Sequence, residues 1–329
     1  MKSLAIIGAG IAGITLARQL QGNAEISIFE KSKGFGGRMA TRQAGSYQFD
    51  HGAQFFTARS KQFQSIINDC VAESQIQAWM PRIVTLDPKK KPFKREWFEP
   101  HYIAAPSMSS LCKALARGLH VTLDTQVAGI DAVEQGWLLK GSSGQQLGHF
   151  DWVVSTSPAP QANELLPDCF VYKAELSTVD FSPCFSLMLG FESTHELNFD
   201  AAIVRNSLLS WIASNSSKQG RPPSFSLMVH SDNTWARKQF DSNIDDIRDK
   251  MLEALDEIIG DPLPLPDHIA IHRWKYAKAE SSCEENFLLD ESNRLAACGD
   301  WCGGNRVEDA YLSGLKLGKE LQMLWRRKT

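Results

Sequence analysis

The chain has 329 residues, of which 43% are hydrophobic and 22% are charged, and its formal net charge is -3. This length predicts about two domains, and the small negative charge offers no electrostatic basis for binding nucleic acid or an anionic membrane. No apolar run of the sequence is long enough to cross a bilayer. Seven scattered cysteines, with Cys298 and Cys302 as the only close pair, predict reduced thiols and no metal site.

The N-terminus carries a strand, a glycine turn and a helix in immediate succession. An apolar run over residues 4–7 predicts a buried strand, residues 14–20 have helical spacing, and the six residues between them read Gly-Ala-Gly-Ile-Ala-Gly. Gly8 suits a tight turn, Gly10 lets a pyrophosphate approach the backbone, and Gly13 lets helix and strand pack closely. The free N–H groups at the start of the helix would face the phosphates.

A second predicted strand, residues 26–29, ends at Glu30, whose carboxylate suits hydrogen bonds to a ribose 2′-hydroxyl. These features predict a dinucleotide site, for which the fingerprint alone permits NAD or FAD. Cleavage of a signal peptide here would remove the fingerprint, so we expect a cytoplasmic protein. The expected cofactor contacts in this region are Gly8, Gly10, Ile11, Ala12, Gly13, Glu30 and Lys31.

Two further motifs follow the fingerprint. In residues 34–42, paired glycines let the backbone pass close to a ligand, and Arg38 offers a bidentate donor to phosphate. Residues 50–54 read Asp-His-Gly-Ala-Gln between aromatic residues. Because the chain reaches this segment directly from the predicted phosphate site, we expect both motifs to lie near the cofactor. The candidates are Gly37, Arg38, His51, Gly52, Ala53 and Gln54.

Both motifs resemble those of the flavin-containing amine oxidase superfamily, and within it the renalase-like branch. The resemblance implies FAD as cofactor and an α/β fold, in which a Rossmann-type FAD-binding domain carries an inserted substrate domain. That inserted domain is expected to be a mixed, mainly antiparallel β-sheet with helices. One departure is Gly34, which stands where the family's second motif usually has arginine.

The remaining elements follow from periodicity and turn residues. Helices are predicted over 61–76, from Ser107 or Ser109 to about Arg117, and over 243–259. Strands are predicted over 82–86, 95–104, 121–123, 125–130, 136–140, 151–156, 185–191, 208–213, 224–230 and 272–277. Between the first two strands, the basic cluster of Lys89, Lys90, Lys91, Lys94 and Arg95 is expected in a solvated loop.

Two of these predicted strands carry site candidates. Strands 125–130 and 136–140 resemble the start of the family's β-meander, where the residue matching Val127 contacts adenine through its backbone. Strict alternation over residues 272–277 puts His272, Trp274 and Tyr276 on one face. The resemblance places that face near the flavin, so the three are candidate substrate contacts, with core packing or a sheet surface as the alternative.

Near the C-terminus, a predicted strand over residues 295–300 ends on a Gly-Asp pair, and a helix is expected from Arg306 to about Trp325. This arrangement resembles the family's carboxyl-terminal flavin motif. There, Asp300 would bind the ribityl or pyrophosphate portion, and the positive end of the helix would stabilise a reduced, anionic flavin edge. The candidates in this motif are Gly299, Asp300, Val307 and Glu308.

Cofactor motifs at opposite ends of the chain require that the substrate domain be inserted between them. We therefore expect an FAD-binding domain from 1–60, 104–163 and 288–329, and a substrate domain from 61–103 and 164–287.

FAD is favoured over NAD because the second glycine pair and the Gly-Asp segment resemble flavoprotein motifs, and no second nucleotide fingerprint is present. The resemblance implies an oxidase that takes a hydride from 1,2- or 1,6-dihydro-NAD(P) onto flavin N5 and passes the electrons to dioxygen, giving H2O2. Such a dihydropyridine needs positioning but no general base, so no catalytic side chain is assigned. The alternatives are an amine oxidase and a non-catalytic flavin-binding sensor.

Overall fold

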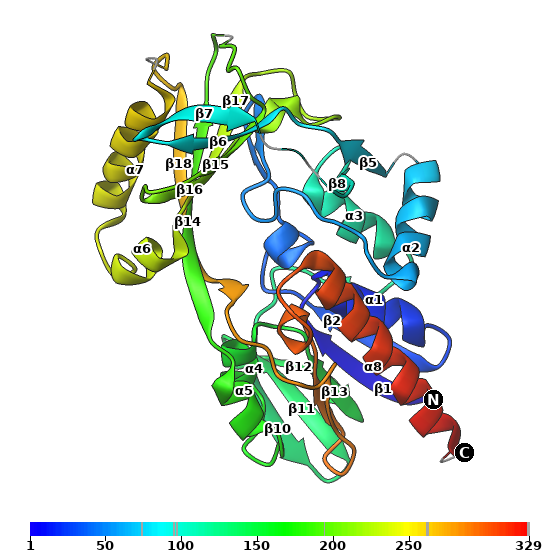
Figure 1. Ribbon diagram of the computed structural model, residues 1–329. Coiled ribbons are helices and arrows are strands. Elements are labelled where there is room, and N and C mark those ends of the chain that lie inside the picture. The colour runs from blue at the N-terminus through cyan, green and yellow to red at the C-terminus, as the bar shows by residue number, and fades with distance from the viewer. Residues whose placement is uncertain (74, 95, 97, 194, 261–262, 328–329) are drawn as a thin grey trace.

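The computed structural model (Figure 1) describes residues 1–73, 75–94, 96, 98–193, 195–260 and 263–327. Its first sheet has the order β19-β20-β13-β1-β2-β9, and all neighbours are parallel except β19 and β20. The strands are β1 (Lys2–Ile7), β2 (Ala24–Phe29), β9 (Val121–Thr122), β13 (Trp152–Ser155), β19 (Leu288–Asp290) and β20 (Leu295–Ala297). Segments from both ends and the middle of the chain therefore meet in one sheet.

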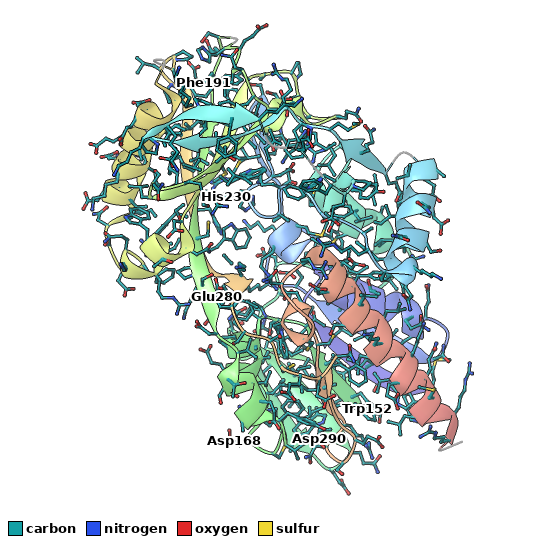
Figure 2. All side chains as sticks on the ribbon, in the orientation of Figure 1. Trp152, Asp168, Phe191, His230, Glu280 and Asp290 are labelled. Atoms are coloured by element: carbon teal, nitrogen blue, oxygen red, sulfur yellow. The ribbon has the colours of Figure 1, made fainter. Side chains whose placement is uncertain are left out.

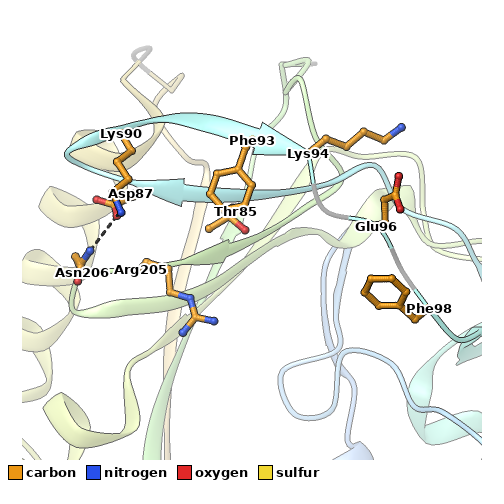
Figure 3. A pocket seen from close by; sticks show the side chains of 9 residues that line it. All are labelled: Thr85, Asp87, Lys90, Phe93, Lys94, Glu96, Phe98, Arg205 and Asn206. Atoms are coloured by element: carbon orange, nitrogen blue, oxygen red, sulfur yellow. Dashed lines mark hydrogen bonds and ion pairs between the residues drawn. The ribbon is translucent and has the colours of Figure 1, made fainter.

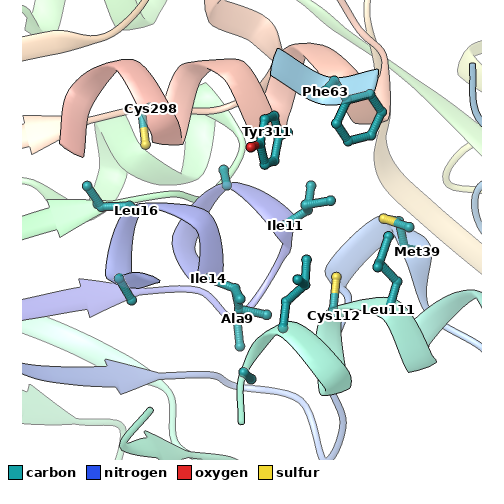
Figure 4. Close-up of a cluster of buried hydrophobic side chains, with 14 of the residues drawn as sticks. Ala9, Ile11, Ile14, Leu16, Met39, Phe63, Leu111, Cys112, Cys298 and Tyr311 are labelled. Carbon is teal, nitrogen blue, oxygen red and sulfur yellow. The ribbon is translucent and has the colours of Figure 1, made fainter. Parts of the chain in front are cut away.

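The two faces of this sheet are covered differently. Leu4 and Ile6 of β1 lie in a cluster with α1 (Ile11–Leu20) and α8 (Val307–Arg327), part of which is drawn in Figure 4. Ala5 and Ile7 lie in a second cluster with the antiparallel strands β10 (Val127–Val133), β11 (Gly136–Gly141) and β12 (Gln146–Phe150). Successive apolar side chains of β1 thus point to opposite faces of the sheet, and both faces are buried, as a parallel sheet requires.

Helices α1 and α8 pack very closely. A Cβ atom on Gly314 of α8 would lie 2.2 Å from the Ala12 carbonyl oxygen. Glycine at this position therefore lets the C-terminal helix lie directly against the helix that follows the nucleotide fingerprint.

The second sheet has the order β18-β14-β17-β16-β15-β6-β7, and only β15 and β6 are parallel within it. Its strands are β6 (Ile83–Asp87), β7 (Lys90–Lys94), β14 (Phe181–Gly190), β15 (Ala201–Val204), β16 (Leu209–Ser214), β17 (Ser226–Ser231) and β18 (His268–Ala279). Helices α6 (Asn233–Lys238) and α7 (Ile244–Ile259) supply side chains to the cluster on one face of this sheet. The mixed, mainly antiparallel sheet is confirmed.

Shorter elements connect the two sheets. The hairpin of β3 (Arg42–Ala44) and β4 (Tyr47–Phe49) precedes the pair of β5 (Ile76–Trp79) and β8 (His101–Ala104). The remaining helices are α2 (Lys61–Ala72), α3 (Met108–Leu115), α4 (Ala159–Leu165) and α5 (Lys173–Thr178), with single 3-10 turns η1 (Gly37–Met39), η2 (Asn215–Ser217) and η3 (Asp300–Cys302). Within the described residues, no helix is long and apolar enough to cross a membrane.

Most predicted elements are confirmed, and three need correction. The helix predicted over 61–76 ends at Ala72, and residue 76 already belongs to β5. The basic loop is wrong, because Lys90–Lys94 forms edge strand β7; backbone pairing tolerates lysine, which also discourages edge-to-edge association. The strand predicted over 95–104 begins only at His101, while Arg95 lies outside the described residues. The division into two domains stays a prediction.

Candidate cofactor and substrate site

The glycine turn between β1 and α1 shows which glycines the protein itself requires. Gly8 has a φ of +112°, and a Cβ on Gly13 would lie 2.2 Å from the Gly8 carbonyl oxygen. A Cβ on Gly10 would meet no protein atom closer than the Gly36 carbonyl oxygen, at 4.0 Å. The open side of the turn at Gly10 therefore fits the close approach of a pyrophosphate.

Glu30 lies at the C-terminal end of β2, facing this turn. Its carboxylate accepts hydrogen bonds of 2.8 Å from the backbone N–H groups of Ala9 and Ser32. The Glu30 carbonyl oxygen accepts a further hydrogen bond from Thr125 N–H, two residues before Val127. The acid and the start of the β-meander therefore meet at one edge of the sheet, while Lys31 beside them is exposed.

The second glycine motif packs on the first. The Gly36 N–H donates to the Ala9 carbonyl oxygen over 3.1 Å, and a Cβ on Gly37 would lie 3.8 Å from Gly10 Cα. Both glycines have positive φ, 111° and 54°, which side chains disfavour. Glycines separated by nearly thirty residues therefore form one continuous backbone surface.

Arg38 joins this surface to the C-terminal motif. Its guanidinium donates two hydrogen bonds of 2.6 Å to Asp300 and lies over the Phe181 ring. Its carbonyl oxygen accepts from Ala53 N–H, and a Cβ on Gly52 would lie only 2.0 Å from that oxygen. Three of the four motifs predicted to bind the cofactor, residues 34–42, residues 50–54 and the C-terminal Gly-Asp segment, thus meet at this arginine.

Glu308, at the start of α8, is buried, and its side chain binds backbone N–H groups of the protein. Its carboxylate accepts hydrogen bonds from Arg59 N–H at 3.1 Å and Ser60 N–H at 2.6 Å. A contact between a flavin and residues Val307 or Glu308 would therefore rest on the helix backbone, whose N–H end is favourable for negative charge. Gly299 lies immediately before η3, and its N–H donates a hydrogen bond to Ser313 Oγ.

Asp50, next to His51, is the centre of a buried ion cluster. Its carboxylate contacts Lys218 Nζ at 3.2 Å and Arg221 at 2.7 Å, and all three side chains are fully buried. Burial alone would raise the pKa of Asp50, but Lys218 and Arg221 outweigh it and lower that pKa to about 2. Lys218 Nζ also donates to Gln54 Oε1 at 3.2 Å, so the cluster holds both ends of the 50–54 motif.

His51 lies against two of the predicted substrate contacts. Its ring stacks on Trp274, with centroids 5.2 Å apart, and meets His272 edge-on at 5.0 Å. Its carbonyl oxygen accepts hydrogen bonds from Trp274 Nε1 and Ser186 Oγ. Burial, helped by repulsion from His272, lowers the pKa of His51 to about 4, so this imidazole is neutral at pH 7.

Tyr276 is set apart from this stack. The pairing of β18 with β14 is irregular between Trp274 and Lys278, which interrupts the alternation. The Tyr276 ring packs edge-on against Phe181 at 5.8 Å. Because Phe181 also lies under the Arg38 guanidinium, Tyr276 is beside the convergence of the cofactor motifs.

A row of side chains crosses the second sheet at the level of His51. The register pairs Ser186 with His272 and His230, and pairs His230 with Trp211. Residues paired across strands share a face, and the Ser186 hydrogen bond to His51 shows that this face is turned toward the cofactor motifs. Figure 2 shows His230 in the interior between the sheet and these loops.

Buried polar atoms along this row have no protein partner among the described residues. They are His230 Nε2 and Trp211 Nε1, together with Trp79 Nε1 on β5. The Trp211 and Trp79 rings both lie near Phe55, with centroids 5.8 and 6.2 Å from it. Buried polar atoms without partners fit a site that hydrogen-bonds a polar ligand.

Sequence patterns missed Lys218, Arg221, His230, Trp211 and Trp79. One available signal was Asp50 itself, since a carboxylate inside an apolar segment needs a buried cation. The other residues depend on cross-strand register, for which the sequence offers no local signal.

Comparison with known proteins agrees with this arrangement. The profile described as flavin containing amine oxidoreductase matches residues 96–317, and that of an NAD(P)-binding Rossmann-like domain matches residues 6–70. Renalase of Mus musculus is 22% identical over 308 residues, covering 87% of each chain. A proposed protoporphyrinogen oxidase from Exiguobacterium sp. 255-15 is similar in fold, with a TM-score of 0.79, 14% identity, and coverage of 98% of this chain and 99% of that one. Wild-type putrescine oxidase bound to putrescine gives a TM-score of 0.68 at 9% identity, with the same coverage.

Proposed function

This chain belongs to the flavin containing amine oxidoreductase family and is an FAD-dependent oxidoreductase, and we propose that its substrates are isomeric dihydronicotinamide dinucleotides. These are the 1,2- and 1,6-dihydro forms of NAD(P), with dioxygen as electron acceptor and H2O2 as product. The observation that carries the proposal is the neutral, aromatic wall of His51, Trp274 and His230 beside the converging cofactor motifs. The similarity to renalase along most of the chain supports the same substrate class.

Bound FAD supplies a hydride acceptor at its N5 atom. The chain's own contribution is to hold the FAD and to place the substrate, which donates the hydride, against it. The open turn at Gly10 and the Glu30 carboxylate fit the pyrophosphate and ribose of FAD. The pair of Arg38 and Asp300 fits the part of FAD between its adenine and flavin ends. The N-terminus of α8 offers a positive dipole end that favours negative charge on a reduced cofactor.

A dihydropyridine ring loses a hydride because the product is aromatic, so the protein needs to orient it rather than remove a proton. The stacked rings of His51 and Trp274 suit a flat ring. His230 Nε2 and Trp211 Nε1, both without protein partners among the described residues, suit the carboxamide of a nicotinamide. Burial first, and then the nearby Lys218 charge, lower the pKa of His230 to about 4, so it too stays neutral at pH 7.

An amine substrate is the second candidate, and the family and the fold likeness to putrescine oxidase favour it. The charge distribution argues against it. A carboxylate that could attract an ammonium group, Asp50, is already neutralised by Lys218 and Arg221. The wall beside the cofactor motifs is formed by neutral rings, which suit an uncharged donor better.

Anaerobic mixing of the oxidised holoenzyme with candidate donors tests the proposal. The donors are 1,2- and 1,6-dihydro-NAD, ordinary NADH and a panel of primary amines, and the readout is the blue absorption of the flavin. Rapid bleaching by the isomers alone, with H2O2 formed when air is admitted, is the expected result. Bleaching by amines alone would show an amine oxidase, and a flavin that no donor reduces would favour a sensor.

A further inference from the structure

Two features outside the proposed substrate site lie at opposite ends of the second sheet. A hollow of about 650 Å³ lies beside β6 and β7, where Asn206 donates a hydrogen bond to Asp87 (Figure 3). Because β7 and β18 are the two edges of the sheet, this hollow is remote from the aromatic wall. A pair of cysteines, in contrast, lies where the chain leaves β18 for the C-terminal cofactor motif.

These cysteines are Cys283, shortly after β18 ends, and Cys302, the last residue of η3. The Cys283 N–H donates a hydrogen bond to the Trp301 carbonyl oxygen at 3.1 Å, which places the two segments side by side. Both thiols are free and belong to the same buried cluster, with Cys283 9% and Cys302 3% exposed. The fold therefore brings two reduced thiols together beside a predicted cofactor motif.

The two thiols interact directly and differ in acidity. Contact with the Cys302 side chain lowers the pKa of Cys283, although burial acts in the opposite direction. Burial, followed by the contact with Cys283, raises the pKa of Cys302 well above its usual value. Because the thiolate is the nucleophile in thiol oxidation, Cys283 suits the attacking sulfur and Cys302 the sulfur that resolves the product.

Cys298 is closer to Cys302 in the sequence but is a poorer partner. It lies in the cluster on the opposite face of the first sheet and is fully buried. Burial raises the pKa of its thiol to about 12, so it is protonated at pH 7. The geometry therefore favours Cys283 as the partner of Cys302.

We propose that Cys283 and Cys302 form a peroxide-reactive site, in which H2O2 released by the enzyme oxidises the two thiols to a disulfide. The inference rests on the proposed function, which supplies the peroxide. The Cys283 sulfur attacks one oxygen of H2O2, the O–O bond breaks, and water leaves with the thiol proton, so that Cys283 becomes a sulfenic acid. The Cys302 sulfur then attacks the Cys283 sulfur, the S–O bond breaks, and a second water leaves with the Cys302 proton. Two thiols lose two electrons in all, and one H2O2 is reduced to two molecules of water.

The disulfide would join segments that already meet at the C-terminal motif. Asp300, at the start of η3, accepts two hydrogen bonds from Arg38, and Asn305 donates one to the carbonyl oxygen of Ala279 at the end of β18. Oxidation would therefore tie the chain that leaves β18 covalently to the segment that holds Arg38.

Controlled oxidation of the reduced holoenzyme tests the site. Treatment with H2O2 should remove two of the seven thiols counted after denaturation, and dithiothreitol should restore both. Peptide mapping should find Cys283 joined to Cys302. The matched control is Cys169→Ser, which removes an exposed cysteine and should still form the cross-link. A full set of thiols after treatment, or a cross-link between other cysteines, would overturn the inference.

Two further variants test the assigned order of attack. Cys302→Ser should leave a sulfenic acid on Cys283 that dimedone traps, because no resolving thiol remains. Cys283→Ser should leave the thiol of Cys302 unmodified under the same treatment. Dimedone labelling of Cys302 in place of Cys283 would contradict the order, and the peptide map of the wild-type protein decides the pairing even if a variant does not fold.

The source of the peroxide separates this inference from the proposed function. Aerobic turnover of 1,6-dihydro-NAD should produce the same disulfide, and added catalase should prevent it. If turnover releases H2O2 but no disulfide forms, the inference fails while the proposed function stands. If the dihydronucleotide does not reduce the flavin, the proposed function fails, and treatment with added H2O2 still decides whether the two thiols react.

Discussion

His51 and Trp274 are 223 residues apart in the chain, yet their rings stack, and the Trp274 indole donates a hydrogen bond of 2.9 Å to the His51 carbonyl oxygen. Two contacts of different kinds therefore fix the 50–54 motif against β18. One end of this pair belongs to a predicted cofactor motif and the other to the predicted substrate strand. Substitutions at either residue, with flavin occupancy and KM measured separately, should show whether the contact serves cofactor binding or substrate binding.

Trp274→Ala should raise the KM for the dihydronicotinamide substrate about fivefold, because a lost ring contact is worth about 1 kcal/mol. Flavin occupancy should hold, since the cofactor motifs converge on Arg38 instead. Trp274→Phe keeps a ring but loses the indole N–H, so it should fall between wild type and Trp274→Ala. The control is Trp235→Phe, whose ring packs on the opposite face against Phe185. An unchanged KM in both Trp274 variants would assign this residue to packing alone.

Acid should destabilise the fold through His51. Its pKa is about 4 in the folded chain, against 6.5 in a free side chain, because burial and His272 disfavour the charged ring. The unfolded chain binds the extra proton below pH 6.5, so stability is full above 6.5 and is lost as the pH falls toward 4. Between pH 7 and pH 5 the loss should be about 2 kcal/mol from this group. Urea unfolding at both pH values measures it.

His51→Gln removes the titrating group and should shrink that difference in stability by the same amount. His149→Gln, at an exposed position on β12, is the matched control and should leave the difference as it is. An equal pH dependence in His51→Gln and wild type would contradict the expected contribution of His51.

Two glycines of the fingerprint should respond differently to alanine. Gly10 has φ and ψ of -77° and 176°, which alanine adopts, and its Cβ would meet no close protein atom. Gly10→Ala should therefore keep the stability of the apoprotein but lower FAD occupancy. Gly13→Ala places a Cβ against the Gly8 carbonyl oxygen and should cost about 1–3 kcal/mol of folding free energy. Thermal unfolding of stripped protein and flavin absorbance separate the two effects; full occupancy in Gly10→Ala would count against the pyrophosphate site.

Lys218→Met should destabilise the fold by about 3 kcal/mol, because it leaves the buried Asp50 carboxylate with one cation instead of two. Since Lys218 also holds Gln54, the variant should bind FAD more weakly after refolding. Lys278→Met, at a half-exposed lysine that pairs with Glu280 over 3.5 Å, is the control and should change little. Comparable denaturation midpoints for the two variants would show that the buried cluster contributes no more than a surface pair.

Local sequence patterns were sufficient to predict the elements whose structure depends on their own residues. The succession of strand, glycine turn and helix over residues 2–20 is confirmed because each glycine has a local backbone reason to be there. The long helix at 244–259 is confirmed because its apolar spacing and its Asn243 cap are local as well. The FAD cofactor followed from such motifs together with family resemblance.

Long-range contacts were beyond these patterns. Residues 215–221 read Asn-Ser-Ser-Lys-Gln-Gly-Arg, a composition typical of a solvated turn, yet Lys218 is buried because Asp50, 168 residues earlier, lies against it. Similarly, strands β16 and β17 were expected, but only their register brings Trp211 opposite His230. Pairings of this kind depend on the assembled sheet and cannot be derived from either strand alone.

Strand β14 has a mechanical consequence for how substrate enters. Its ten residues are all buried; Phe181 at one end packs in the cluster of the first sheet, and Leu189 near the other packs under α7. Its ladder with β18 extends from Gly190 to Phe181 with one register shift between Ser182 and Cys184, and Figure 1 shows β14 running from one sheet toward the other. A rotation of the two sheets away from each other would bend β14 or break its pairing with β18. Exchange of substrate and product is therefore expected to depend on local movement of connecting segments around the aromatic wall, with the distance between the two sheets held constant through the catalytic cycle.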